Sequence, residues 1–263
     1  MTTNKPGDDV MTVVAISLIA EMVTNVVHEG LGHAATALAT GTTLGVLSTV
    51  EWAGGADTRL VAAAGTLANL AAAFIFWLAW KTARQSSVRR RYFLFLGFTF
   101  NVLAGTGYFF FSGVTGFGDG AIVMDGLHPQ WFWRVLLGAG GLVAYFAAAL
   151  IVGRALVRYV GVSRNDLPRL RHLTLIPYLS AVGILCLSAL FNPAGIQLMW
   201  KSALPGTAGG HSGLLWLRFY IPRKTAPERP CGAIERSHAW IATATALSLV
   251  FVYLVGRGIT LRR

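Results

Sequence analysis

The sequence contains few charged residues and especially few acidic ones. Charged residues make up 13% of the 263 residues, about half of the roughly 25% found in a typical soluble domain. Hydrophobic residues make up 54%, and the mean hydropathy is +0.58. Because so few charges cannot cover a surface that faces water, the composition excludes an ordinary soluble domain. We expect an integral membrane protein whose surface largely contacts the lipid bilayer.

Cysteine is also scarce, and the basic excess has no nucleic-acid signature beside it. Cys186 lies in an apolar run and Cys231 in a polar loop, so we expect no structural disulfide. The net charge of +11 comes without RNA-binding aromatic motifs or zinc-finger spacings. We therefore expect no nucleic-acid partner and assign the basic residues to cytoplasmic loops and lipid headgroups. The N-terminus lacks a basic region and a cleavage site, which predicts that the first apolar run is retained.

Long apolar runs are what the sequence has in abundance. A membrane span needs about 20 mainly apolar residues, because a helix rises about 1.5 Å per residue across a hydrocarbon core of about 30 Å. Backbone polar groups in lipid must be satisfied internally, so each such run is expected to be a helix. The prediction is an all-α, multi-pass transmembrane bundle with about six spans, at residues 10–38, 59–80, 92–112, 132–153, 173–192 and 239–256.

The basic residues predict how these spans are oriented. Clusters of Lys and Arg follow the second, fourth and sixth spans, whereas the opposing loops at 40–58 and 113–131 carry acids and no basic residue. Simple alternation of six spans then places both termini and these clusters in the cytoplasm. The connection at 193–238 breaks the pattern, because it is basic but falls on the outer side. We expect a re-entrant or interfacial segment near 205–221, and the orientation of the last helix stays open.

The first span carries an unusual set of polar residues. Glu21, Asn25, His28, Glu29 and His33 all lie within apolar sequence. On a helix that turns about 100° per residue, the first three lie on one stripe, with Glu29 beside it. Ionisable groups at membrane depth are costly and usually functional. A structural cluster that joins helices is the alternative interpretation.

The histidines resemble a zinc-hydrolase motif with one additional residue. In HExxH, two imidazoles one helical turn apart bind the metal, and the glutamate takes a proton from the metal-bound water. Here His28 and His33 are five positions apart, and in an α-helix they point about 140° away from each other. A π-bulge at Gly30 and Gly32 absorbs the additional residue and restores a shared face. We favour this over the alternative, in which Glu29 and His33 are the ligands and His28 lies behind them.

Three motifs in order resemble the site-2 protease family of intramembrane zinc metalloproteases. The first is the histidine helix. The second is Ala64-Gly65-Thr66-Leu67-Ala68-Asn69, similar to the family's Ala-Gly-Pro-x-x-Asn with Thr66 in place of proline. The third is an Asp-Gly pair, for which the chain offers Asp119-Gly120 and Asp125-Gly126. The resemblance covers residues 21–126, which predicts a catalytic core at 1–130 and additional membrane helices at 131–263.

The resemblance implies a zinc site and a set of roles. His28, His33 and Asp119 are expected to bind Zn²⁺ and Glu29 to act as general base, with Asp125 as the alternative third ligand. We prefer Asp119 because it continues directly from an apolar run, whereas Asp125 approaches the polar turn at 128–129.

The remaining polar residues are expected to support the site. Asn69 is assigned to the lining of the site and to substrate binding, and Glu21 and Asn25 to its surroundings. His211, in a glycine-rich segment, is a weaker candidate for contact with metal or substrate.

The sequence therefore predicts a membrane-embedded zinc metalloprotease that cleaves membrane-protein substrates, most simply in the cell membrane. Two alternatives stay open: a metal-binding transporter or channel, and a homologue that binds membrane proteins without cleaving them. The charge pattern runs the histidine helix outward from the cytoplasm, opposite to the family's usual direction. Substrate identity and oligomeric state are not indicated by the sequence.

Overall fold

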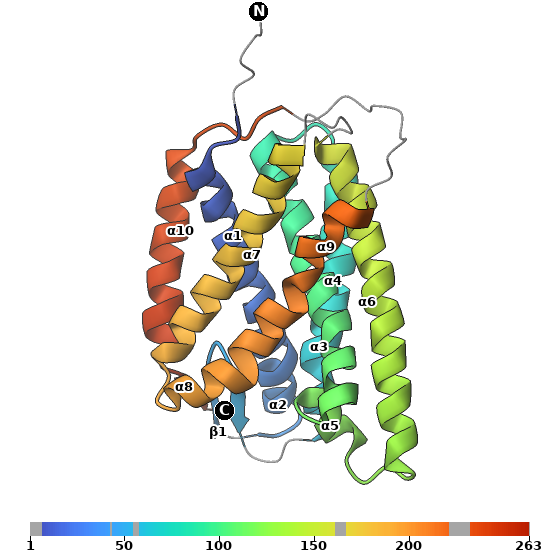
Figure 1. Cartoon of the computed structure of the whole chain (residues 1–263). Helices are drawn as coiled ribbons and strands as arrows, with labels where there is room; N and C mark the ends of the chain where they lie inside the picture. Colours follow the sequence, from blue (N-terminus) through green and yellow to red (C-terminus); the bar gives the residue numbers. More distant parts are fainter. Residues whose placement is uncertain (1–6, 43, 55–57, 161–166, 221–231, 263) are drawn as a thin grey trace, which may run out of the picture.

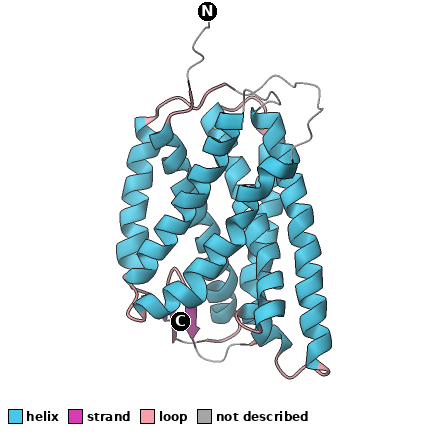
Figure 2. Ribbon diagram, in the orientation of Figure 1, coloured by secondary structure: helices cyan, strands magenta, loops and turns pink. Residues whose placement is uncertain are grey.

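The protein is a bundle of long helices with a small sheet at one end (Figures 1 and 2). The computed structural model describes residues 7–42, 44–54, 58–160, 167–220 and 232–262. Six helices are long and apolar enough to cross a membrane, which confirms the predicted all-α membrane fold. They are α1 (Val10–Asn25) with its continuations η1 (Val26–Ala34) and α2 (Ala35–Ala39), α3 (Arg59–Thr82), α4 (Val88–Thr115), α6 (Gln130–Val160), α7 (Leu167–Leu190), and α10 (His238–Val250) with η6 (Phe251–Val255).

A further helical run lies between α7 and α10. It consists of α8 (Gly195–Leu198), η3 (Met199–Ala203), η4 (Pro205–Gly209), η5 (Gly210–Ser212) and α9 (Gly213–Tyr220). Figure 1 shows this run climbing through the bundle from the end that carries the sheet toward the opposite end. Its first half winds mainly as π-helix, and its apolar sequence is interrupted by lysine, proline and glycine. The segment that we expected to be re-entrant or interfacial therefore belongs to a longer helical run that passes through the bundle.

This crossing inverts the last helix relative to the simple alternation. The start of α10 lies beside the start of α1, because the Ser237 backbone N–H donates to the Thr12 hydroxyl at 3.0 Å and that of Asp9 to the Ile234 carbonyl at 2.7 Å. The bidentate ion pair of Asp8 with Arg169 brings the start of α7 to the same end. We call this the N-terminal end, and the opposite end, which carries the sheet, the sheet end.

The basic residues divide differently from the sequence-based expectation. Those around the α3–α4 connection, Arg169 and Arg236 lie at the N-terminal end. Arg257 and Arg262 lie at the sheet end, because the strand that contains Arg262 pairs with β1. Simple alternation, which would place both termini on one side, therefore does not hold: the additional passage inverts the last helix, whose orientation the sequence left open. Arg223, Lys224, Arg229 and Cys231 lie outside the described residues.

The sheet is a feature that the sequence analysis did not predict. Its strands are β1 (Leu44–Leu47), β2 (Trp52–Gly54) and β3 (Ile259–Arg262), in the antiparallel order β2-β1-β3. Val46 pairs with Ala53 on one side and with Thr260 on the other. Trp52 packs in a small buried cluster with Ala34, Ala37 and Val61, so the hairpin covers the end of the first span. The sheet therefore lies along one side of the polar residues of η1.

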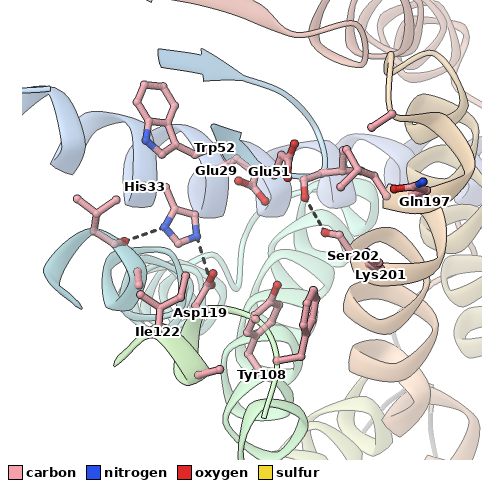
Figure 3. A pocket seen from close by; sticks show the side chains of 18 of the residues that line it. Glu29, His33, Glu51, Trp52, Tyr108, Asp119, Ile122, Gln197, Lys201 and Ser202 are labelled. Atoms are coloured by element: carbon pink, nitrogen blue, oxygen red, sulfur yellow. Dashed lines mark hydrogen bonds and ion pairs between the residues drawn. The ribbon is translucent and has the colours of Figure 1, made fainter. Parts of the chain in front are cut away.

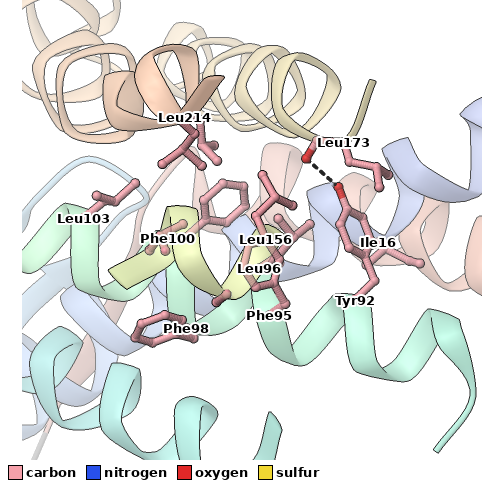
Figure 4. Packing of buried hydrophobic residues seen from close by; sticks show 14 of the residues in the cluster. Ile16, Tyr92, Phe95, Leu96, Phe98, Phe100, Leu103, Leu156, Leu173 and Leu214 are labelled. Atoms are coloured by element: carbon pink, nitrogen blue, oxygen red, sulfur yellow. Dashed lines mark hydrogen bonds between the residues drawn. The ribbon is translucent and has the colours of Figure 1, made fainter. Parts of the chain in front are cut away.

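Helix α4 lies at the centre of the main hydrophobic core. Its aromatic and leucine side chains pack against α1, α6, α7 and α9, with the largest fully buried residues being Ile16, Tyr92, Phe95, Leu96, Phe100, Leu103, Leu156, Leu173, Leu214, Leu217 and Ile234 (Figure 4). The hydroxyl of Tyr92 donates to the Leu173 carbonyl at 3.0 Å, which satisfies a polar group in this core. Packing on several sides holds α4 in a fixed position. The C-terminal half of α4 therefore lies in a fixed position beside the polar residues of α1 and η1.

Candidate metal centre

The first span changes from α- to π-helix where the histidines lie. The π-helix η1 covers Val26–Ala34. Because a π-helix forms i→i+5 hydrogen bonds, residues five apart are about one turn apart. His28 and His33 accordingly share a face, with their Nε2 atoms 3.2 Å apart and their rings edge to face. The predicted π-bulge is confirmed, and it extends over nine residues rather than a single turn.

Asp119 completes a triangle with the two histidines. It is the first residue of α5 (Asp119–Met124), which follows α4 after a turn that contains Gly116 and Gly118, with φ of 67° and 79°. Its Oδ2 lies 3.3 Å from His28 Nε2 and 3.2 Å from His33 Nε2. Among the described residues these three form a group with convergent metal-ligating atoms. Asp125 lies beyond it at the end of α5, where its carbonyl oxygen accepts a hydrogen bond from Arg59.

The histidine tautomers are set by oxygen acceptors behind them. His28 Nδ1 lies 2.6 Å from Asn69 Oδ1, and His33 Nδ1 lies 2.7 Å from the Val61 carbonyl oxygen. Since these oxygens only accept, each Nδ1 carries the proton and donates. Each Nε2 then presents a lone pair toward the other histidine and toward Asp119. This is how metal-binding histidines are commonly oriented.

The three convergent atoms fit a tetrahedral cation. Two imidazole lone pairs and a carboxylate oxygen at 3.2–3.3 Å repel one another unless positive charge lies between them. Zinc ligands at about 2.0–2.1 Å in a tetrahedron lie about 3.3 Å apart. Asp119 Oδ2 is buried without a hydrogen bond in the described part of the protein, although both histidine nitrogens are close. Two His and one Asp would leave the fourth zinc position open, as in catalytic sites.

The charge of Asp119 agrees with this arrangement. Asp119 lies outside the candidate spans. Burial raises the pKa of its carboxyl group, but the ring nitrogens of His28 and His33 beside it outweigh burial and hold that pKa well below its usual range. The carboxylate is therefore ionised at neutral pH and available as a ligand.

Glu29 borders a cavity next to this group. Its side chain is buried, and its Oε2 has no hydrogen-bond partner within the described ranges. The cavity, which we call the outer cavity, has a volume of about 490 Å³ and is lined by η1, the β1–β2 hairpin, the α4–α5 turn and η3 (Figure 3). His33 and Asp119 also line it. The carboxyl group of Glu29, two members of the metal-ligating triad and open space for a substrate therefore adjoin one another.

Asn69 supports His28 through a network of hydrogen bonds. Besides accepting from His28, it donates from Nδ2 to Asn101 Oδ1 at 2.8 Å and to the Thr24 carbonyl at 3.2 Å. Asn101 donates in turn to the Thr24 hydroxyl at 2.9 Å. These bonds use the amide of Asn69 within the protein, which leaves it no free donor for substrate. This network joins α1, α3 and α4 behind the metal-ligating face.

The remaining predicted residues lie on the other side of Glu29, around a smaller inner cavity of about 50 Å³. Asn25 donates to the Thr49 carbonyl at 2.8 Å. Glu21 Oε2 lies 2.8 Å from His211 Nε2, and both residues are buried. His211, the weaker candidate for contact with metal or substrate, is therefore paired with Glu21 and lies outside the group of His28, His33 and Asp119. A buried acid in an apolar span requires a partner. The presence of Glu21 in the first span was therefore the sequence feature that could have predicted such a pair.

Substitution of Asn69 by alanine tests the hydrogen bond to His28. Without the Oδ1 acceptor, the His28 ring loses its fixed tautomer and orientation, and we expect zinc affinity to fall about 10–100-fold. Zinc competition with a chromogenic chelator measures the change. Thr82→Ala, which removes side-chain hydrogen bonds to the Leu78 and Ala79 carbonyls at the far end of α3, is the control. Unchanged zinc affinity in Asn69→Ala would contradict the supporting role of Asn69.

Comparison with protein-family models, with curated proteins and with solved structures finds no match to this chain. The description of the site therefore rests on its own residues and their geometry.

Proposed function

We propose that this protein is a membrane-embedded zinc metalloprotease that cleaves peptide bonds of membrane-protein substrates, as the resemblance to site-2 proteases suggests. One observation carries the proposal: three metal-ligating atoms of His28, His33 and Asp119 converge within 3.2–3.3 Å of one another. Glu29, which is buried and whose Oε2 has no hydrogen-bond partner among the described residues, lines the adjoining cavity. A metal triad with a neighbouring general base is the arrangement that metal-assisted hydrolysis needs.

In this mechanism the protein residues bind, orient and move protons. His28, His33 and Asp119 hold the zinc ion, which when bound polarises a carbonyl group and lowers the pKa of water toward about 7. Glu29 takes a proton from the attacking water and passes it to the leaving amine nitrogen. Asn69 and the Val61 carbonyl hold the two imidazoles in the tautomer that the site requires.

The position of the site suggests where a substrate meets it. The outer cavity lies at the sheet end, and the clusters of basic residues lie at the N-terminal end. By the positive-inside rule, the N-terminal end is cytoplasmic and the site opens toward the outer side of the cell membrane. This orientation is opposite to the usual one in the family that the chain resembles. A substrate helix must unwind before attack, because its amides are protected by their own hydrogen bonds.

Glu29→Gln tests the proposed function. The amide keeps the shape of the side chain and cannot accept a proton from water, so cleavage is expected to fall about 10²–10⁴-fold while bound zinc stays unchanged. The assay follows release of fragments from a fluorescently labelled casein by purified protein in detergent, with zinc measured by mass spectrometry. Glu235→Gln, at an exposed position at the N-terminal end, is the matched control.

The outcomes separate the competing functions. Full cleavage by Glu29→Gln would overturn the role of Glu29. A wild-type protein that binds zinc, cleaves nothing and transports zinc into vesicles would favour the transporter. Zinc binding with neither cleavage nor transport would favour a membrane-protein-binding homologue.

A further inference from the structure

Tyr108 lies where the two cavities meet. It belongs to α4 and lines both the outer and the inner cavity, as do Glu29 and Ser202. Its ring is tilted by 41° against that of His28, with ring centroids 5.2 Å apart. The side chain therefore adjoins both a metal-ligating residue and the general base of the proposed reaction.

The ring of Tyr108 is held in place while its hydroxyl group is free. A methyl group added at Gly118 would lie 3.3 Å from Tyr108 Cε1, so the α4–α5 turn packs closely against the ring. Phe111 contacts it from the same helix, with ring centroids 6.2 Å apart. In Figure 3 the Tyr108 side chain points from α4 into the outer cavity, on the side where Asp119 and Ser202 lie. No described residue accepts from or donates to its hydroxyl.

Several polar donors close to the triad already donate to protein oxygens. Asn69 Nδ2 donates to two oxygens, and both histidine Nδ1 atoms donate to oxygens behind them. Ser202 donates to the Val50 carbonyl at 2.6 Å. Lys201 lines the outer cavity from an exposed position on its η3 wall. The phenol of Tyr108 is thus an uncommitted donor beside the buried part of the site, among the residues that the structure describes.

We propose that Tyr108 is a catalytic residue whose hydroxyl donates a hydrogen bond to the carbonyl oxygen of the scissile peptide. This inference rests on the proposed proteolytic function. When water oxygen adds to the carbonyl carbon, Glu29 takes the water proton and the carbonyl oxygen gains negative charge. An electron pair on this oxygen then re-forms the carbonyl double bond and the C–N bond breaks. The proton passes from Glu29 to the leaving amine nitrogen. A fixed donor aimed at the developing charge stabilises the transition state more than the substrate.

Tyr108→Phe isolates this hydrogen bond because it keeps the ring that packs against His28 and Gly118. Loss of one donor of this kind costs about 10²–10³ in rate in well-studied hydrolases. We expect kcat for the labelled casein to fall about 100-fold with KM unchanged and with zinc content equal to wild type. Tyr253→Phe, on the outer surface beside Phe191, is the matched control and should leave all three values unchanged.

A binding measurement provides a readout that does not depend on turnover. The probe is a phosphinic pseudopeptide with leucine on both sides of its tetrahedral phosphinyl group, which imitates the charged oxygen of the transition state. Tyr108→Phe is expected to raise its Kd about 100-fold, in proportion to the loss in kcat. The Kd of the leucyl-leucine peptide without the phosphinyl group should not change.

Each other outcome counts against the inference in a distinct way. Unchanged kcat and unchanged probe affinity in Tyr108→Phe, together with an inactive Glu29→Gln, would overturn the role of Tyr108 and leave the protease standing. Loss of zinc from Tyr108→Phe would make Tyr108 a positioning residue for His28 and overturn the catalytic role. A zinc-loaded wild-type protein that neither cleaves casein nor binds the probe would overturn the proposed function and, with it, this inference.

Discussion

Replacing His33 by alanine is expected to reduce bound zinc from about one ion per chain to a trace, because two protein ligands do not hold a catalytic zinc ion. His33 is the best-held ligand of the three: it is buried, and its Nδ1 donates to the Val61 carbonyl at 2.7 Å. His28→Ala should have the same effect, because the Nε2 atom of His28 lies 3.2 Å from that of His33 and belongs to the same group of ligand atoms. Mass spectrometry of the purified protein gives the zinc content, and circular dichroism checks that the helices persist.

The two Asp-Gly pairs supply a matched comparison for the third ligand. Asp119→Asn should lower zinc content strongly, because its carboxylate oxygen faces both histidine nitrogens. Asp125→Asn should keep full zinc, because that residue contributes to its surroundings through its backbone carbonyl. His238→Ala, at the start of α10, controls for loss of any histidine. Full zinc occupancy in both His28→Ala and His33→Ala would end the metal-site hypothesis.

Replacing Gly65 by alanine is expected to disrupt the site without removing any polar group. A Cβ at this position would lie 2.3 Å from His33 Nε2 and 2.8 Å from His28 Cε1. It would therefore occupy space needed by both imidazoles. The close approach of α3 to η1 at Gly32 leaves little room for relief, because a Cβ at Gly32 would meet Gly65 Cα at 2.5 Å. Displacement by about 1 Å can cost about 10²-fold in activity.

We expect Gly65→Ala to lose zinc affinity at least about 10-fold and casein cleavage about 10²-fold. The measurements are zinc competition with a chelator and initial cleavage rates. Gly183→Ala is the matched control: it lies within α7, and a Cβ there meets nothing within 4 Å. If Gly65→Ala kept wild-type zinc affinity, the two imidazoles could not lie against Gly65 when zinc is bound.

Features that depend on local pattern were predictable. The six spans follow from runs of apolar residues, since backbone groups in lipid leave a helix as the local solution, and all six are present. The π-helix also followed from a local argument: two histidines five apart can share a face only if the helix widens. The structure brings His28, His33 and Asp119 together and places Glu29 beside them, although whether they bind zinc stays a prediction.

Features that join distant segments were not predictable. The Glu21–His211 pair joins residues 190 positions apart, and the partner of a buried acid can come from any helix. The β3 strand pairs with β1, where Leu44 faces Arg262, which lies 218 positions later in the chain. Asn69 was assigned to the site by resemblance, but its hydrogen bonds with His28, Thr24 and Asn101 could not be predicted from the sequence.

The sequence by itself determined that this is a helical membrane protein and where its spans lie, because apolar runs in lipid must satisfy their own backbone hydrogen bonds. It also determined which few polar residues those spans carry. Only the tertiary structure decided that the run from Gly195 to Tyr220 passes through the bundle. That run is irregular and interrupted by Lys201 and Pro205, so its hydropathy alone does not mark it as a span. Packing against neighbouring helices stabilises it, and this packing sets the side on which the chain ends.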